Sequence, residues 1–157
     1  MSGGDRFLEA ADRLGFAADV RRFPEGTKTA DDAARAVGCE VDQIVKSLVF
    51  TTDVGGAVLC LTSGRHRVDT QKLARLAGVA LVRRATPDEA RAATGFAIGG
   101  TPPFGHPAPV RTWIDEMLAS FPVVWAAAGM PDTVFPLDPG TLASLSGGVW
   151  ADVAERP

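Results

Sequence analysis

Two consecutive apolar segments constrain the fold of this chain most strongly. Residues 43–51 and 57–62 are rich in β-branched and other apolar side chains, and a connection containing Gly55 and Gly56 separates them. Short apolar segments of this kind form strands, and a glycine-containing connection of this length closes an antiparallel pair. The sequence therefore predicts a β-hairpin near the middle of the chain.

Helical and extended patterns alternate on both sides of this hairpin. Helices are expected over residues 5–14, 29–38 and 69–76, with further starts at 86 and 138. Extended segments are expected at 20–23, 79–83, 110–114, 123–127, 133–137 and 149–153. The chain has 157 residues, 46% of them hydrophobic, and no linker or repeat interrupts the alternation. We therefore expect one domain over residues 1–157, of the α/β (α+β) class, with a mixed sheet covered by helices.

Local signals place several helix ends and apolar faces. Thr29 can cap a helix with Asp32 as its capping-box acid, and residues 86–89 (Thr-Pro-Asp-Glu) form a second such start. Asp115 directly follows a predicted strand and is expected to cap the next helix. The first helix should bury one apolar stripe. That stripe comprises Phe7, Leu8, Ala11 and Leu14. The aromatic residues expected to pack in the interior rather than bind a ligand are Trp113, Trp125, Trp150 and Phe135.

Composition narrows the classes of function. The formal net charge is −3 and the pI is about 5.3, which disfavours a protein that coats nucleic acid through bulk charge but leaves room for local basic patches. Candidate patches are Arg21, Arg22 and Lys28; Arg65, His66, Arg67, Lys72 and Arg75; and Arg83 and Arg84. No apolar stretch is long enough to span a bilayer and the first residues lack the pattern of a signal peptide, so a cytoplasmic location without membrane contact is expected.

The cysteine and histidine content predicts neither a metal nor a disulfide. Cys39 and Cys60 lie far apart in apolar surroundings and are expected to be buried. His66 and His106 are the two histidines, so a three-histidine metal site is impossible. We therefore expect no metal ion and no other cofactor.

Lys46 is the most unusual polar residue, because it interrupts an otherwise apolar strand, Ile44-Val45-Lys46-Ser47-Leu48-Val49-Phe50. A cation in such a strand must reach the edge of the sheet or lie over a polar cleft. In the first case Lys46 simply extends into solvent. In the second it is a point charge directed at a phosphate or a developing oxyanion.

The segment Gly99-Gly100-Thr101-Pro102-Pro103 and the following Phe104-Gly105-His106 combine glycine with proline at high density. Glycine lets a ligand approach the backbone closely and proline holds the loop rigid, so the loop suits binding, although an ordinary tight connection has the same composition. It matches neither a dinucleotide-binding fingerprint nor a phosphate-binding P-loop. His106 is either a general base or a polar residue at the rim of a site.

Taken together and in order, these motifs resemble the YbaK/ProX family of trans-acting aminoacyl-tRNA deacylases, relatives of the editing domain inserted in bacterial prolyl-tRNA synthetase. The matching segments cover nearly the whole chain. They are Thr29-Ala30, residues 43–50 with Lys46, residues 99–106, Trp113-Ile114-Asp115-Glu116, Ala128-Gly129 and residues 150–154.

The resemblance implies a mixed, partly barrel-like sheet flanked by helices, with a pocket that hydrolyses the ester of mischarged aminoacyl-tRNA without a metal. It implies that Lys46 contacts the phosphate of the terminal adenosine, and that Gly99 and Gly100 belong to the catalytic loop that orients the aminoacyl group and the attacking water or ribose hydroxyl. Implied substrate-binding residues are Phe23, Thr29, Ser47, Thr101, Pro102, Pro103, His106 and Gly129. The implied partners are the acceptor end of aminoacyl-tRNA, with tRNA(Pro) as one candidate, and prolyl-tRNA synthetase as a candidate protein partner.

Two positions depart from the family's patterns. Ser47 follows the lysine, where the branch that clears alanyl-tRNA usually has asparagine. After Gly129 the chain reads Met130-Pro131-Asp132-Thr133-Val134-Phe135, where the branch that clears cysteinyl-tRNA would have a glycine- and base-rich turn followed by an aspartate in the strand. Alanine, cysteine and similar small amino acids therefore all stay open as substrates. Two other functions also stay open: a non-catalytic module that binds a tRNA end or a synthetase, and an unrelated small-molecule binding domain.

Overall fold

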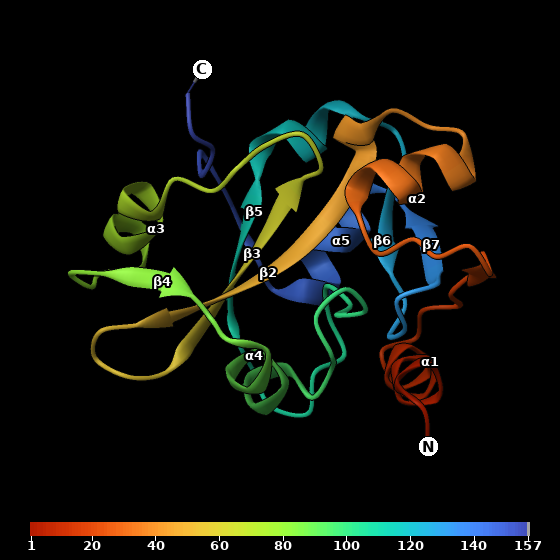
Figure 1. The fold of residues 1–157 in the computed structure, drawn as a ribbon, viewed down its shortest axis with the longest axis horizontal. Helices are drawn as coiled ribbons and strands as arrows, with labels where there is room; N and C mark the ends of the chain where they lie inside the picture. Colours follow the sequence, from red (N-terminus) through yellow and green to blue (C-terminus); the bar gives the residue numbers. More distant parts are fainter. Residues whose placement is uncertain (157) are drawn as a thin grey trace.

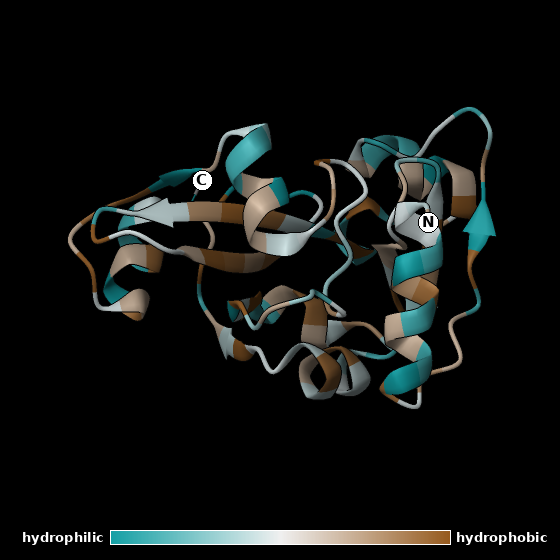
Figure 2. Cartoon of the chain, turned by 90° about the horizontal axis from the view of Figure 1, so that it is seen from below, coloured by the Kyte–Doolittle hydropathy of each residue, from teal (hydrophilic) through white to brown (hydrophobic). Residues whose placement is uncertain are grey.

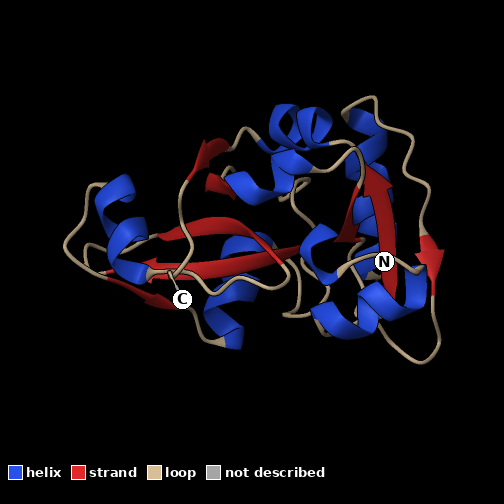
Figure 3. Ribbon diagram, turned by 90° about the horizontal axis from the view of Figure 1, so that it is seen from above, coloured by secondary structure: helices blue, strands red, loops and turns tan. Residues whose placement is uncertain are grey.

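The computed structural model describes residues 1–156 and shows a mixed sheet with helices packed around it (Figures 1 and 3). The helices are α1 (Gly3–Arg13), α2 (Ala30–Val37), α3 (Thr70–Ala77), α4 (Pro87–Thr94) and α5 (Pro139–Ser146), with the 3-10 helices η1 (Val41–Gln43) and η2 (Glu116–Ser120). The strands are β1 (Arg21–Arg22), β2 (Ile44–Thr52), β3 (Ala57–Ser63), β4 (Val82–Arg84), β5 (Arg111–Asp115), β6 (Val124–Ala127), β7 (Thr133–Leu137) and β8 (Val149–Ala151).

The predicted hairpin is confirmed as the centre of the sheet. β2 and β3 pair antiparallel, with Val45 opposite Ser63 and Thr51 opposite Ala57. The strand order is β1-β7-β6-β2-β3-β5-β8, and the pairs β2–β6, β3–β5 and β5–β8 are parallel. The mixed sheet flanked by helices is thus confirmed. Over residues 1–156 it stays open, because β1 and β8 end the strand order at opposite sides and are not paired with each other.

The second edge of β2 is shared between two short strands. Ile44 and Val45 pair with β6, whereas residues 50–52 pair with β4. Figure 1 shows β6 and β7 beside one end of the long β2 strand and β4 beside the other. Between these partners the edge is free of strand pairing within the described residues, and one backbone bond, from Ala85 N to Val49 O at 2.9 Å, joins the next segment. The sheet therefore parts at residues 46–49.

The capping signals position the helices largely as predicted. Thr86 and Glu89 form a complete capping box, and Thr29 Oγ accepts a hydrogen bond from Asp32 N at 3.1 Å. The carboxylate of Asp32 does not complete a box but pairs with Arg35. Asp115 Oδ1 accepts from Met117 N and caps η2, as expected. Strand β4 begins at Val82 rather than at residue 79, because α3 ends in a left-handed turn and the chain must turn before it reaches β2.

The predicted stripe of α1 is partly wrong. Phe7 and Ala11 are buried as expected, but Leu8 and Leu14 are 45% and 46% exposed, and Ala10 is buried instead. Successive helical residues differ by about 100° around the axis, so the neighbour of Phe7 points away from the face that Phe7 buries. Figure 2 shows the resulting alternation of polar and apolar colour around α1 and the apolar colour of the central strands.

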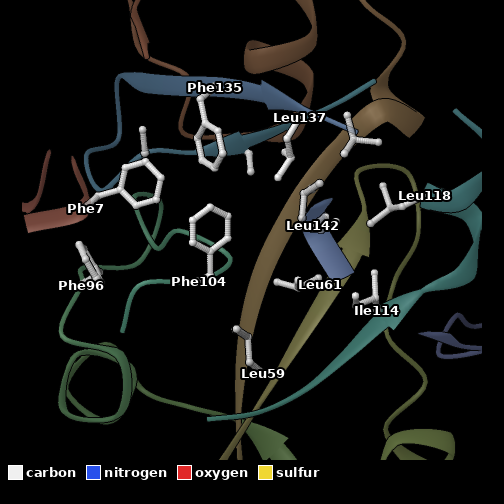
Figure 4. Packing of buried hydrophobic residues seen from close by; sticks show 14 of the residues in the cluster. Phe7, Leu59, Leu61, Phe96, Phe104, Ile114, Leu118, Phe135, Leu137 and Leu142 are labelled. Carbon is white, nitrogen blue, oxygen red and sulfur yellow. The ribbon is translucent and has the colours of Figure 1, made fainter. Parts of the chain in front are cut away.

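A phenylalanine cluster joins α1 to the sheet and to the glycine- and proline-rich loop. The ring centres of Phe7 and Phe135 lie 4.9 Å apart, and Phe104 lies 5.6 Å from Phe7 and 5.8 Å from Phe135. These rings point toward one another in Figure 4. Because Phe104 belongs to this core, the loop that precedes it is fixed from behind by aromatic packing.

Close backbone contacts explain why glycine occupies two positions. Gly129 has φ +100°, and a Cβ at this position would overlap the backbone oxygen of Gly3 at the start of α1. A Cβ at Gly100 would lie 2.9–3.0 Å from the backbone of Met130. The turn at residues 129–131 is therefore clamped between α1 and the glycine-rich loop. No helix in the described residues has the length and apolarity needed to cross a membrane.

We expect Gly129→Ala to destabilise the fold more than Gly147→Ala. Both glycines have positive φ, and a left-handed alanine costs about 1–2 kcal/mol. Gly147 has open space at its Cβ, whereas Gly129 faces Gly3, so overpacking should add about 1–3 kcal/mol for Gly129→Ala alone. Urea unfolding of both variants measures the difference. Equal losses of unfolding free energy would contradict the close contact.

Candidate functional site

A cavity of about 520 Å³ lies where the sheet parts. Its walls come from β2, from β6, and from β4 and α4 together with the segments that follow them. The N-terminus of α2 and the glycine-rich loop close it. The lining residues are Thr27–Asp31, Ala33, Ile44–Val49, Gly64, Arg84, Ala85, Ala90, Ile98, Gly99, Thr101, Trp125–Ala127 and Val134.

Lys46 lines this cavity and its ammonium group is anchored. Its Nζ donates a hydrogen bond to the backbone oxygen of His66 at 2.6 Å. Partial burial lowers the pKa of Lys46 below the ordinary value of 10.5, and the positive charge of Arg84 lowers it further, while Asp115 opposes the shift. The bonded partner is a neutral carbonyl, so the charge of the ammonium group is left for an anion in the cavity.

The segment that holds Lys46 is fixed by a buried carboxylate. Asp115 is 2% exposed, and its Oδ2 lies 2.7 Å from His66 Nδ1 and accepts from Ser63 N at 3.0 Å. One carboxylate thus joins the end of β3, the His66 turn and η2. The sequence predicted only the capping role of Asp115, because the approach of β5 to β3 that brings it to His66 is a non-local contact.

The mouth of the cavity carries more positive than negative charge. Lys28 and Arg84 line it together with Lys46, and Asp31 is the carboxylate-bearing residue among the lining residues in the described chain. The aliphatic stem of Lys28 crosses Gly99, since a Cβ at Gly99 would lie 3.1 Å from Lys28 Cγ. The sequence indicated candidate basic patches that contain Lys28 and Arg84, but it gave no sign that these two residues lie near Lys46.

The glycine-rich loop presents only part of itself to the cavity. Gly99 and Thr101 line it, whereas Gly100, Pro102 and Pro103 are not among its lining residues. Thr101 is 4% exposed and its Oγ1 donates to Ala97 O at 3.1 Å, which braces the loop internally.

His106 lies behind the loop rather than in the cavity beside Lys46. Its Nε2 is 2.8 Å from Pro102 O, its ring packs edge-on against Phe96, and burial lowers its pKa. It lines a second cavity of about 370 Å³ between the loop and α1. The imidazole therefore supports the loop from the side that faces away from Lys46.

The other predicted site residues also fall into two groups, those that line the cavity and those that do not. Ser47 and Thr29 line the cavity, with the Thr29 hydroxyl engaged in the cap of α2. Phe23 and Gly129 do not line it; the backbone N–H of Phe23 bonds Asp132 O at 2.8 Å, next to the Gly129 turn.

Trp125 packs against a core cluster, as predicted, but it also borders the cavity. Trp125 is only half-buried, lines the cavity, and stacks on the guanidinium of Arg21 at 4.9 Å. Trp150 is 36% exposed. Trp113 and Phe135 are buried as expected. Strand periodicity placed Trp125 on the sheet but gave no sign that β2 lacks a full-length neighbour there.

The lining suits a ligand with one anionic part and one small, mostly apolar part. Lys28, Lys46 and Arg84 supply positive charge to the lining, whereas Val45, Val49, Ala85 and Ala126 supply apolar lining. Within residues 1–156, no three His, Cys, Asp or Glu side chains lie close enough to share a metal ion.

Comparison with known proteins assigns the family. The model of the aminoacyl-tRNA editing domain matches residues 24–145. The chain belongs to the aminoacyl-tRNA editing domain family. The match contains β2, the glycine-rich loop and β6, and hence most of the cavity wall. Membership supports tRNA deacylation as the general activity. That residues 1–157 form a single editing domain stays a prediction.

Relatives of this editing domain resemble it over nearly their whole length. YwhH of Bacillus subtilis, an uncharacterized protein, is 30% identical over 138 residues, which are 87% of each chain. EbsC of Enterococcus faecalis, named as a proposed Cys-tRNA(Pro)/Cys-tRNA(Cys) deacylase, is 27% identical over 85% of this chain and 82% of its own. A crystal structure described as a proposed trans-editing enzyme for prolyl tRNA synthetase superposes with a TM-score of 0.92 and 46% identity, covering 99% of both chains.

We expect the Lys46 amine to titrate below pH 10.5, because partial burial and Arg84 both disfavour its charged form. The unfolded chain then binds more protons than the native state between the two pKa values, so this group's contribution to stability rises with pH across that window. NMR of lysine ¹³Cε signals measures the midpoint, and Lys46→Met assigns the signal by removing it. A midpoint at or above 10.5 would refute the described environment.

Proposed function

We propose that this editing domain hydrolyses aminoacyl-tRNA mischarged with alanine, cysteine or a similar small amino acid, and that it does so without a metal ion. The names given to EbsC and to the structural neighbour support tRNA(Pro) as the tRNA and prolyl-tRNA synthetase as a candidate partner. The observation that carries the proposal is the position of Lys46: an ammonium group bonded to a neutral carbonyl, in the same cavity as Gly99 and Thr101.

Lys46 is assigned to the phosphate of the terminal adenosine. A phosphate next to the ammonium would restore the charge balance that Arg84 and partial burial disturb. Lys28 and Arg84 at the same mouth favour an anionic ligand further. Holding this phosphate fixes the ester relative to the loop wall, and positioning of that kind can contribute much of a rate enhancement.

Gly99 and Thr101, the residues of the loop that line the cavity, are assigned to the reacting ester. Water attacks the ester carbonyl carbon, the bond from that carbon to the ribose oxygen breaks, and the ribose oxygen takes a proton to give a free tRNA end and a free amino acid. An aminoacyl ester is already activated, so orientation of the water or a ribose hydroxyl and stabilisation of the oxyanion need no protein nucleophile.

The remaining predicted residues are proposed to act in two ways, either by touching the substrate or by supporting the cavity wall. Thr29, Ser47 and Thr101 are assigned to direct contact with substrate, since they line the cavity. Residues outside the lining are assigned to holding the wall in place: Gly100 against Met130, His106 against Pro102, and the turn at Gly129. Pro102, Pro103 and Phe23 belong to the same supporting group.

The test is deacylation of tRNA(Pro) charged in turn with alanine, cysteine, serine, threonine and proline, measured both with and without EDTA in the buffer. We expect ester hydrolysis above the uncatalysed rate for at least one small amino acid. Lys46→Ala should lower kcat/KM about 10- to 100-fold, the size of a lost charge-assisted hydrogen bond.

Arg156→Ala is the matched control, because Arg156 is an exposed cation outside the cavity lining. It should leave kcat/KM unchanged. Binding of charged tRNA without hydrolysis of any ester would favour the non-catalytic binding module. Full activity of Lys46→Ala would overturn the site while leaving the deacylase function in place, and loss of activity in EDTA would overturn metal independence.

A further inference from the structure

Ser47 carries a buried hydroxyl without a partner. Among residues 1–156, its Oγ is the buried side-chain nitrogen or oxygen atom that lacks a hydrogen bond. Buried polar groups are normally satisfied, and exceptions call for an explanation such as a missing ligand or water. Ser47 also lines the cavity at the parting of the sheet. Ser47 is therefore a wall residue of the proposed site whose hydroxyl oxygen is shielded from solvent.

The surroundings of Ser47 are apolar on its own side of the sheet. Adjacent strand residues point to opposite faces, so Ser47 shares a face with Val45 and Val49 and not with Lys46. Val45, Val49 and Leu61, the cross-strand partner of Ser47, all belong to the main core cluster. The cavity thus extends from a charged face of β2 around its free edge to an apolar face with one hydroxyl.

The neighbouring polar groups of the cavity wall that could bond Ser47 already have other partners. The Thr101 hydroxyl donates to Ala97 O, the Thr29 hydroxyl accepts from Asp32 N, and Lys46 Nζ is bonded to His66 O. Ser47 Oγ keeps both its donor and its acceptor capacity. Rotation about the Cβ–Oγ bond turns the hydroxyl hydrogen without moving the oxygen, so the group can donate or accept as a bound partner requires.

We propose that Ser47 selects aminoacyl esters whose side chain carries a β-hydroxyl group, that is, serine or threonine. This inference rests on the proposed deacylase function and names the substrate class of the same site. The alanines at 85, 90 and 126 leave room for a small side chain, and the Ser47 hydroxyl is the group that distinguishes serine from alanine. Cysteine is the weaker match, since a thiol is a poor hydrogen-bond donor and acceptor.

The test compares seryl, cysteinyl and alanyl esters on the same tRNA body, so that contacts to the tRNA cancel. Wild-type kcat/KM should fall in the order serine, cysteine, alanine. Ser47→Ala should lower the serine-to-alanine ratio of kcat/KM about tenfold, as loss of one hydrogen bond predicts. Ser47→Cys, which keeps the size but weakens the bond, should give an intermediate ratio.

Ser144→Ala is the control for serine removal, because Ser144 is an exposed residue of α5 outside the cavity. The serine-to-alanine ratio of kcat/KM of this variant should equal that of wild type. Thermal unfolding of Ser47→Ala should show no loss of Tm, since the deleted hydroxyl has no partner in the protein. The Ser47 inference would be overturned, while deacylation itself stood, if Ser47→Ala changed kcat/KM equally for the seryl and alanyl esters. Wild-type rates that do not favour the seryl ester over the alanyl ester would overturn it too. Absence of hydrolysis with every ester would overturn the proposed function and this inference with it.

Discussion

The division of one strand edge between two partners determines the rest of this structure. β2 is nine residues long, but β6 covers two residues at its start and β4 three at its end. Strand edges left unpaired inside a protein expose backbone groups that need other partners or water. The gap at residues 46–49 is consequently where a cavity can exist within an otherwise packed sheet, and both Lys46 and Ser47 fall inside it.

The gap also explains how one cavity combines a charged part with an apolar part. Side chains at consecutive positions of β2 point to different faces, and a free edge is the place where a ligand can touch both. On one face the Lys46 ammonium is anchored through His66 to a turn that Asp115 fixes. On the other, the Ser47 hydroxyl lies among core residues. The proposed recognition of charge by Lys46 and the proposed selection of the side chain by Ser47 are thereby separated by the thickness of a single strand.

Local signals in the sequence predicted most of the fold but only part of the site. The hairpin and the capping residues depend on short spacings, and the family resemblance depends on the order of short motifs along nearly the whole chain. Lys46 stood out because a cation interrupts an apolar strand. Contacts between distant segments were not accessible: the exposure of Trp125 depends on the missing neighbour of β2, and the position of His106 behind the loop depends on Phe104 packing into the α1 core. Loop residues 99–103 were predicted as one unit, although only Gly99 and Thr101 reach the cavity.

We propose that the parted edge of β2 is the substrate site. The most direct measurement is a crystal structure of the protein with seryl-adenosine 5′-phosphate in which an amide replaces the labile ester. We expect the phosphate beside Lys46 Nζ, the ribose along Gly99 and the seryl group between Ser47 and Ala126. An analogue bound in the second cavity beside His106, with the space at Lys46 empty, would contradict it.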